Sequence, residues 1–409
     1  RPDSAAISGW YRLIVGTAEP KRLGGRLVLP TEENSLEFAQ HTLKNGLEIV
    51  AECNEEVHST ALGFFVRTGS RDETDALAGV SHFLEHMMFK GTPTRTADNV
   101  NREFDEMGAH YNAFTSEENT VYYAAVLPEC QQRCVELLAD IMRPSLREED
   151  FHTEKKVILE EIQMYEDQPP FGADDKIKAV HFGSHPLSRS VLGTNQSVSE
   201  MSAAQMKDYF QRRYSPQNIV LVGAGRIDFP TLIADAQRLC GDWPRIETRR
   251  ELPTAKSTAS FDVIQRELAS QQYVLQLMTA PEAEDADRFA AKLLTTVVGD
   301  DSGSRFYWEF IDSGLAEHAS LGHYEYQGAG VYMTYMSCDP EQAADNLQRI
   351  RNVFEQVERD GLHGNELAQA KTKVKARVVL GSERPRNRLF SVGGNWTARH
   401  EYRQVKHDL

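Results

Sequence analysis

Cysteine is scarce in this chain of 409 residues, which contains only five. An odd number of scattered thiols does not form the disulfide framework of a small secreted domain, so a reducing compartment is favoured. Cys130 and Cys134 lie one helical turn apart, but a zinc site built on cysteines would need a second pair, so packed thiols are the better interpretation. The five are Cys53, Cys130, Cys134, Cys240 and Cys338.

Long apolar runs and secretory signals are also missing. No stretch of 18 or more apolar residues is present, so no membrane-spanning helix is expected. The first thirty residues lack the charged start, apolar centre and small-residue cleavage site of a signal peptide. Because the chain begins with Arg1, the earlier removal of a targeting segment stays open. A bacterial cytoplasmic location is favoured, with the mitochondrial matrix and the periplasm as alternatives.

Positive charge is in deficit, since 45 Lys and Arg stand against 61 Asp and Glu and the formal net charge is −16. Binding to nucleic acid depends on clustered Lys and Arg that neutralise phosphates, so nucleic acid is not an expected partner. An acidic surface is compatible with basic peptide partners. A solvated surface that aids solubility is the simpler interpretation.

Strand-like and helix-like segments occur in the same order twice. Strands are indicated by alternating segments such as TALGFFVRTG and NTVYYAAVLP, and amphipathic helices by ECQQRCVELLADIM and TEKKVILEEIQMYED. Between about 270 and 380 the pattern again predicts a strand, helices, paired strands and further helices. We therefore expect an α+β protein with two homologous halves, each a mainly antiparallel sheet packed with helices.

A segment rich in proline, charge and small residues separates these halves and is typical of a linker. Since a copy of the first half would offer a further strand and helix after Leu409, the second half is expected to be incomplete at its C-terminal end. The predicted ranges are 1–36 for an N-terminal extension, 37–235 for a metal-binding half, 236–260 for the linker and 261–409 for a second half without metal.

The stretch GVSHFLEHMMFKGT, which starts at Gly79, carries two histidines and a glutamate on an otherwise apolar helix. His82 and His86 are one turn apart, a separation at which two imidazole nitrogens can reach one ion. In this composition the pattern H-x-x-E-H is expected fewer than about 0.06 times by chance. At about 100° per residue, one side of the helix takes Leu77, Val80, Leu84, Met87 and Met88, and the other takes His82, Glu85, His86 and Phe89.

The helix that begins near Thr153 offers a third ligand. A buried carboxylate is costly unless it is paired or binds a metal, so Glu161 is predicted as the ligand, and Glu160 is predicted to face solvent. Glu154 is either a hydrogen-bond acceptor for a ligand imidazole or a surface acid near the start of the helix. The residues predicted to share one face are Glu154, Val157, Ile158, Glu161 and Tyr165.

With this motif and the segments NAFTSEENTVYY, EKKVILEEIQMYED, HPLSRSVLGT and YSPQNIVLVGAG, the chain resembles a known family. The family is that of the M16 inverzincin metallopeptidases, the group of pitrilysin, insulin-degrading enzyme and mitochondrial processing peptidase. The resemblance covers nearly the whole chain, and it is closest to the short bacterial members and the catalytic subunit of the processing peptidase. It implies one Zn²⁺ per chain held by His82, His86 and Glu161, with Glu85 as general base and Glu154 as support.

The chemistry implied by that resemblance is zinc-dependent endopeptidase activity. Two imidazoles and one carboxylate leave a fourth zinc position for water, whose pKa falls toward about 7. Glu85 would take the proton of this water and pass it to the leaving amine, so the reaction has no covalent intermediate. The rival interpretation is a non-catalytic or scaffold subunit of a two-chain assembly of the same family.

The segment HYNAFTSEENT alternates as a strand does. In the resembling family the matching segment is an edge strand that pairs with an extended peptide through its backbone. Asn112, Ala113, Phe114 and Thr115 are therefore the predicted substrate-binding residues. An ordinary interior strand is the alternative.

One departure from the family pattern concerns the second half, in which self-sufficient members carry an Arg and, seven residues later, a Tyr that bind substrate and stabilise the oxyanion. Phe310 and Glu317 stand at those positions here. Either Arg305, Tyr307 or His318 substitutes for the pair, or a partner chain supplies it. A heterodimer with a homologous chain is the favoured expectation, and a homodimer is the alternative.

Overall fold

The computed structural model describes residues 36–409 except 168–169, 171, 258 and 266–268. The predicted N-terminal extension, 1–36, therefore lies outside the described residues apart from Leu36, the first residue of β1. Among the residues described, no helix combines the length and the apolar character that crossing a membrane requires.

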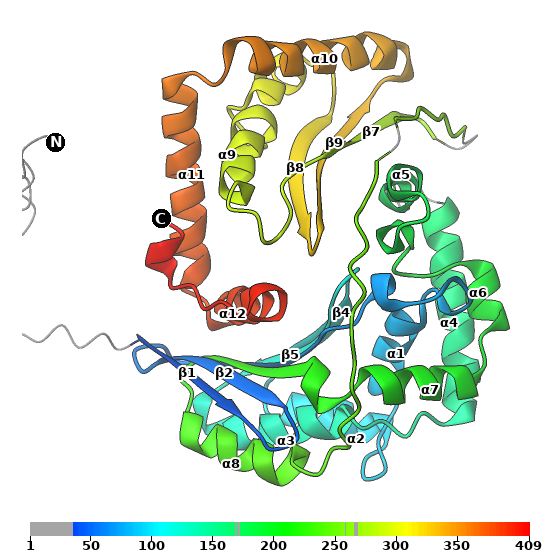
Figure 1. Ribbon diagram of the computed structural model, residues 1–409, viewed down its shortest axis with the longest axis vertical. Helices are drawn as coiled ribbons and strands as arrows, with labels where there is room; N and C mark the ends of the chain where they lie inside the picture. The colour runs from blue at the N-terminus through cyan, green and yellow to red at the C-terminus, as the bar shows by residue number, and fades with distance from the viewer. Residues whose placement is uncertain (1–35, 168–169, 171, 258, 266–268) are drawn as a thin grey trace, which may run out of the picture. The chain divides into compact units, whose positions relative to one another are not determined.

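The first half contains a six-stranded sheet in the order β1-β2-β6-β3-β5-β4 (Figure 1). Neighbouring strands are antiparallel except β2 and β6, which are parallel. Every residue of β3 and β6 is buried, as expected for central strands covered on both faces. The strands are β1 (Leu36–Thr42), β2 (Glu48–Asn54), β3 (Thr60–Val66), β4 (His110–Thr115), β5 (Thr120–Val126) and β6 (Ile219–Gly225).

Helices of the first half bury one face of this sheet in a core that includes Phe64, Phe83, Phe104 and Tyr122. Since α1 packs against α4, β4 and β5, the core places the predicted metal-binding helix beside the predicted substrate strand. The helices are α1 (Val80–Met88), α2 (Ala97–Glu106), α3 (Gln131–Ile141), α4 (Glu148–Asp167), α5 (Ala173–Phe182), α6 (Asn195–Glu200), α7 (Ala203–Arg213) and α8 (Phe229–Cys240).

The second half repeats the predicted succession of elements with a three-stranded antiparallel sheet in the order β7-β9-β8 (Figure 1). Its core joins Phe306 and Phe310 to residues of the sheet and of α10. The prediction of an α+β protein with two similar halves is thus confirmed. The elements are β7 (Gln272–Thr279), α9 (Arg288–Gly299), a π-helix (Tyr307–Ile311), β8 (His318–Tyr326), β9 (Ala329–Cys338), α10 (Ala343–Asp360) and α11 (Gly364–Ser382).

The last helix, α12 (Pro385–Arg399), packs on the sheet of the first half, against β2, β3 and β6 (Figure 1). Leu389 and Val392 share a core with residues of these strands, and a Cβ at Gly393 would lie 2.4 Å from the ring of Phe65. Glycine is therefore needed at this close approach. Residues assigned from the sequence to a second half thus complete the core of the first.

Between the two sheets, the described residues from 241 to 271 form no helix or strand. The predicted linker range, 236–260, starts inside α8, which extends to Cys240. The reason is that apolar residues such as Leu232 and Ala236 continue the buried face of α8 as far as Cys240. Proline-rich, charged sequence then follows, as expected for a connecting segment.

Candidate metal centre

The helix α1 carries three of the predicted site residues within nine positions. Its predicted apolar side is confirmed, because Val80, Leu84, Met87 and Met88 are all buried. The other predicted member of that side, Leu77, lies before the helix in a 3₁₀ turn. A short helix of this kind gains its stability from packing more than from intrinsic propensity.

Glu73 holds the start of α1 from outside the helix. Its two carboxylate oxygens accept hydrogen bonds from the backbone N–H groups of Gly79, at 2.7 Å, and Ser81, at 2.8 Å. These N–H groups have no partner within the helix, so the two carboxyl oxygens of Glu73 satisfy them. Burial raises the pKa of Glu73 to about 8. The sequence did not predict this role, because Glu73 precedes the helix by too many residues to be recognised as a cap.

The three predicted metal ligands lie together. The oxygen Oε2 of Glu161 is 3.8 Å from Nε2 of His82 and 3.8 Å from Nε2 of His86, and the three donor atoms all lie within 4.8 Å of one another. A tetrahedral ion with bonds of about 2.0–2.2 Å needs donors about 3.4 Å apart, so this donor set fits zinc after small side-chain adjustments. Two imidazole nitrogens and one carboxylate are also the donor types that zinc prefers.

The electrostatic surroundings keep His82 available as a ligand. Burial, assisted by the nearby His86, lowers the pKa of His82 to about 4. A neutral imidazole retains the lone pair that coordinates a metal, whereas a protonated one does not.

Glu154 orients the second imidazole. Its Oε2 lies 3.3 Å from Nδ1 of His86, while its Oε1 accepts a hydrogen bond from Nζ of Lys90 at 2.7 Å. A bond at Nδ1 leaves Nε2 of His86 directed at Glu161, which is the usual arrangement of a carboxylate behind a ligand histidine. The structure thus favours the supporting position for Glu154 over a surface acid, since Glu154 is buried. The sequence did not predict the contact between Lys90 and Glu154.

The predicted face of α4 needs one correction. Glu161 is half-buried and Glu160 is exposed, in agreement with the helical spacing. Val157, however, is 43% exposed. The reason is that α4 packs against α1 and α6 along a narrow stripe, and Val157 lies beyond its margin. The buried residues of the stripe are Phe151, Glu154, Ile158 and Ile162.

Glu85 lies on the same helix between the two histidines and contacts the strand β4. Its Oε2 accepts a hydrogen bond from Oγ1 of Thr115 at 2.7 Å. Burial raises the pKa of Glu85 above its ordinary value, and the bond from Thr115 partly offsets this rise. A carboxylate with a raised pKa is suited to accept and return a proton near neutral pH. The contact gives Thr115 a neighbour that the strand pattern did not predict.

Among the described strands, β4 pairs with β5 alone, so it forms an edge of the six-stranded sheet. Asn112 and Phe114 are exposed, whereas Ala113 and Thr115 are half-buried on the side of α1. The backbone N–H of Ala113 donates to Oδ1 of Asn112 at 2.9 Å. The N–H of Ala113 is therefore bonded to a side chain and not to a neighbouring strand. The backbone of an added peptide strand could take the place of this side chain.

The second half does not offer the family's Arg and Tyr at the expected positions. Phe310 is fully buried in the core of that half, and Glu317 is exposed. Arg305, considered as a substitute, donates from Nε and Nη2 to the carboxylate of Glu366 at 3.0 and 2.9 Å. His318 packs against the ring of Tyr335 at a centroid distance of 5.2 Å.

The two α+β halves and the grouping of two histidines with Glu161 agree with the fold and the metal site that the resemblance to the inverted-motif metallopeptidases implied. Two family models match the chain, Insulinase (Peptidase family M16) over residues 48–195 and Peptidase M16 inactive domain over residues 200–374. The chain belongs to peptidase family M16.

Curated relatives match most of the chain. A protein of Mycobacterium tuberculosis named as an uncharacterized zinc protease is 34% identical over 376 residues, which are 90% of this chain and 85% of the relative. A protein of Bacillus subtilis, also named as an uncharacterized zinc protease, is 31% identical over 359 residues, or 87% of each chain.

Solved structures support the same fold. A protease from Helicobacter pylori aligns with a TM-score of 0.83 and 20% identity over 88% of this chain and 90% of that chain. A putative M16-like peptidase from Alicyclobacillus acidocaldarius aligns with a TM-score of 0.77 and 21% identity over 93% of this chain and 95% of that chain. At these identities the similarity concerns the fold alone.

Proposed function

We propose that this protein is a zinc-dependent endopeptidase that hydrolyses short or extended peptides. The observation that carries the proposal is the convergence of His82, His86 and Glu161 within 4.8 Å, with Glu85 on the same helix face. The curated relatives named as zinc proteases support the choice of metal and of reaction class. We take the number of ions to be one per chain, because the described residues offer one such donor group.

The residues of the site have two roles, metal binding and proton transfer. His82, His86 and Glu161 would hold zinc, which supplies a Lewis acid and lowers the pKa of water. Glu85 accepts the proton of the attacking water on Oε1, since Oε2 is occupied by Thr115. The same carboxylate then returns the proton to the leaving amine, so the peptide bond is broken without a covalent intermediate.

The open edge of β4 is the proposed binding place for the substrate backbone. An extended peptide would pair with Asn112, Ala113, Phe114 and Thr115 as an added strand and displace the bond between Asn112 and Ala113. Because Thr115 touches Glu85, such a peptide would pass close to the general base. Folded proteins do not offer an extended free segment, so they should be poor substrates.

Metal removal tests this proposal. An unstructured peptide should be cleaved by the zinc-loaded protein, the cleavage should stop after treatment with a chelator, and added zinc should restore it. Zinc content is measured on each sample alongside turnover. Full activity in a sample shown to be free of metal would rule out the proposed mechanism. A protein that binds no stoichiometric zinc would instead favour the rival scaffold function.

We further propose that full activity requires a homologous partner chain that supplies the Arg and Tyr. The support is that Phe310 is buried and that Arg305 is paired with Glu366. A missing oxyanion donor costs about 10²–10³ in kcat, so the chain alone should turn over slowly. The proposed assembly resembles a processing peptidase in being a dimer of related chains.

The partner requirement is tested by adding homologous chains to the purified protein across a dilution series. We expect weak cleavage by the chain alone and a rise of about 10²-fold or more with the correct partner. Replacing the Arg or Tyr of that partner should remove the gain. Fast turnover by the chain alone at high dilution would refute the requirement, and rescue by a second copy of the same chain would favour a homodimer.

A further inference from the structure

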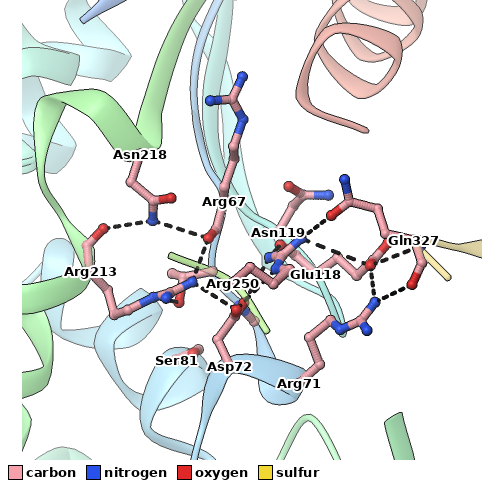
Figure 2. A network of polar contacts seen from close by, with 12 residues as sticks. Arg67, Arg71, Asp72, Ser81, Glu118, Asn119, Arg213, Asn218, Arg250 and Gln327 are labelled. Carbon is pink, nitrogen blue, oxygen red and sulfur yellow. Dashed lines mark hydrogen bonds and ion pairs between the residues drawn. The ribbon is translucent and has the colours of Figure 1, made fainter. Parts of the chain in front are cut away.

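The turn between β8 and β9 in the second half contacts the turn that follows β4 in the first (Figure 2). The backbone N–H of Gln327 donates to Oε1 of Glu118 at 3.1 Å, and its carbonyl accepts from Nη1 of Arg71 at 2.9 Å. The same Nη1 also donates to the carboxylate of Glu118. Three segments distant in the sequence thus meet at one carboxylate.

The segment that connects the two sheets closes this cluster from another side. Arg250 donates to both carboxylate oxygens of Asp72, at 3.0 and 2.7 Å, and to Oε1 of Gln327 at 2.9 Å. It also donates to the backbone carbonyl of Glu118. Figure 2 shows these side chains directed at one another. We name Arg71, Asp72, Glu118, Arg250 and Gln327 the junction cluster.

The junction cluster is buried enough for its ion pairs to affect stability strongly. The side chains of Arg71 and Asp72 are 1% and 2% exposed. Removing one partner of a buried ion pair leaves the other charge without compensation, which is far more costly than losing a surface pair. The arrangement of the two turns is therefore strongly specified.

The turn held by the junction cluster is the direct continuation of the substrate strand. Backbone N–H groups of Ser70 and Arg71 donate to the carbonyls of Ser116, at 3.3 Å, and Glu117, at 2.9 Å. A Cβ at Gly69 would lie 2.2 Å from the carbonyl oxygen of Ser116, so the two segments are in close backbone contact. Thr115, which donates to Glu85, immediately precedes this turn.

We propose that the second half positions the active site of the first. Through the junction cluster, the turn at Gln327 holds the end of β4. It thereby fixes the position of the open edge of this strand, and of Thr115, relative to Glu85. Glu118 is a positioning residue, since it touches neither the metal ligands nor Glu85 and acts through the β4 strand. The second half, most of which is matched by the model for an inactive domain, would then be needed for substrate binding. The kinetic consequence rests on the proposed peptidase function, whereas the structural consequence does not.

The test compares Glu118→Gln with Glu129→Gln, the same change at an exposed glutamate in the 3₁₀ turn Pro128–Cys130, which follows β5. Hydrogen exchange should become about tenfold faster or more at the amides of β4 in Glu118→Gln, with no change at β3 and β6. Zinc content should stay at the level of the unaltered protein. For an unstructured peptide, KM should rise about tenfold, with a smaller fall in kcat, while Glu129→Gln should leave all of these values unchanged.

A second variant covers the case in which Glu118→Gln does not fold. Gln327→Ala removes the side-chain bonds to Arg250 and to the carbonyl of Ala398 but keeps the backbone contacts. It should raise exchange at β4 by a smaller factor and raise KM in parallel. Unchanged exchange at β4 in a folded variant, or an equal rise at β3 and β6, would overturn the proposal. If exchange rises at β4 but no peptide is cleaved by any form of the protein, the proposed function fails and the positioning role stands.

Discussion

Replacing Glu85 by Gln should lower peptide hydrolysis by about 10²–10⁴-fold, the usual contribution of a positioned general acid–base group. The amide of glutamine can still accept a hydrogen bond from Thr115, so the geometry of β4 should persist. What is lost is the ability of this side chain to take a proton from water and return it to the leaving amine. The measurement is kcat/KM for an unstructured peptide, with zinc content determined on the same sample.

Zinc content serves as the control for this variant. Glu85 is assigned to proton transfer and not to coordination, so Glu85→Gln should contain as much zinc as the unaltered protein. Undiminished hydrolysis in the zinc-loaded variant would exclude Glu85 as the base. Loss of zinc together with activity would instead indicate that Glu85 belongs to the ligand set.

Replacing Glu161 by Gln should weaken zinc binding by more than about 100-fold. Residues that support a metal ligand typically account for about 10–100-fold in affinity, so a ligand itself should account for more. The amide is a much poorer ligand than the carboxylate, and the two imidazoles that remain cannot complete the site. Zinc affinity is measured by competition with a chelator of known strength.

The matched control is Glu160→Gln, one position away on the same helix. Glu160 is exposed while Glu161 lies 3.8 Å from both histidines, so the control should bind zinc normally. Equal losses in both variants would contradict the assignment of the ligand face. Glu154→Gln should fall between them, with a loss of about 10–100-fold, because it supports His86 without binding the metal.

Local spacing was sufficient to predict much of this site. The two histidines and Glu85 lie within five consecutive positions, so the angle between them follows from the pitch of one helix. The choice of Glu161 over Glu160 follows from the same pitch on α4. The alternation of HYNAFT likewise predicted the strand β4, but it did not assign Thr115 to the side of α1. The repeat of elements predicted the two halves, because each sheet and its helices are built from neighbouring segments.

The contacts that connect these segments were decided by the tertiary structure. Thr115 meets Glu85, Glu73 holds the start of α1, and α12 returns to the first sheet, where Arg388 pairs with Glu52 across 336 positions of the chain. No periodic pattern encodes such pairs, because their partners become neighbours only when whole elements pack. Helical and strand periodicity thus determined which side chains lie together on one face of each helix or strand. Packing decided which of these faces come into contact.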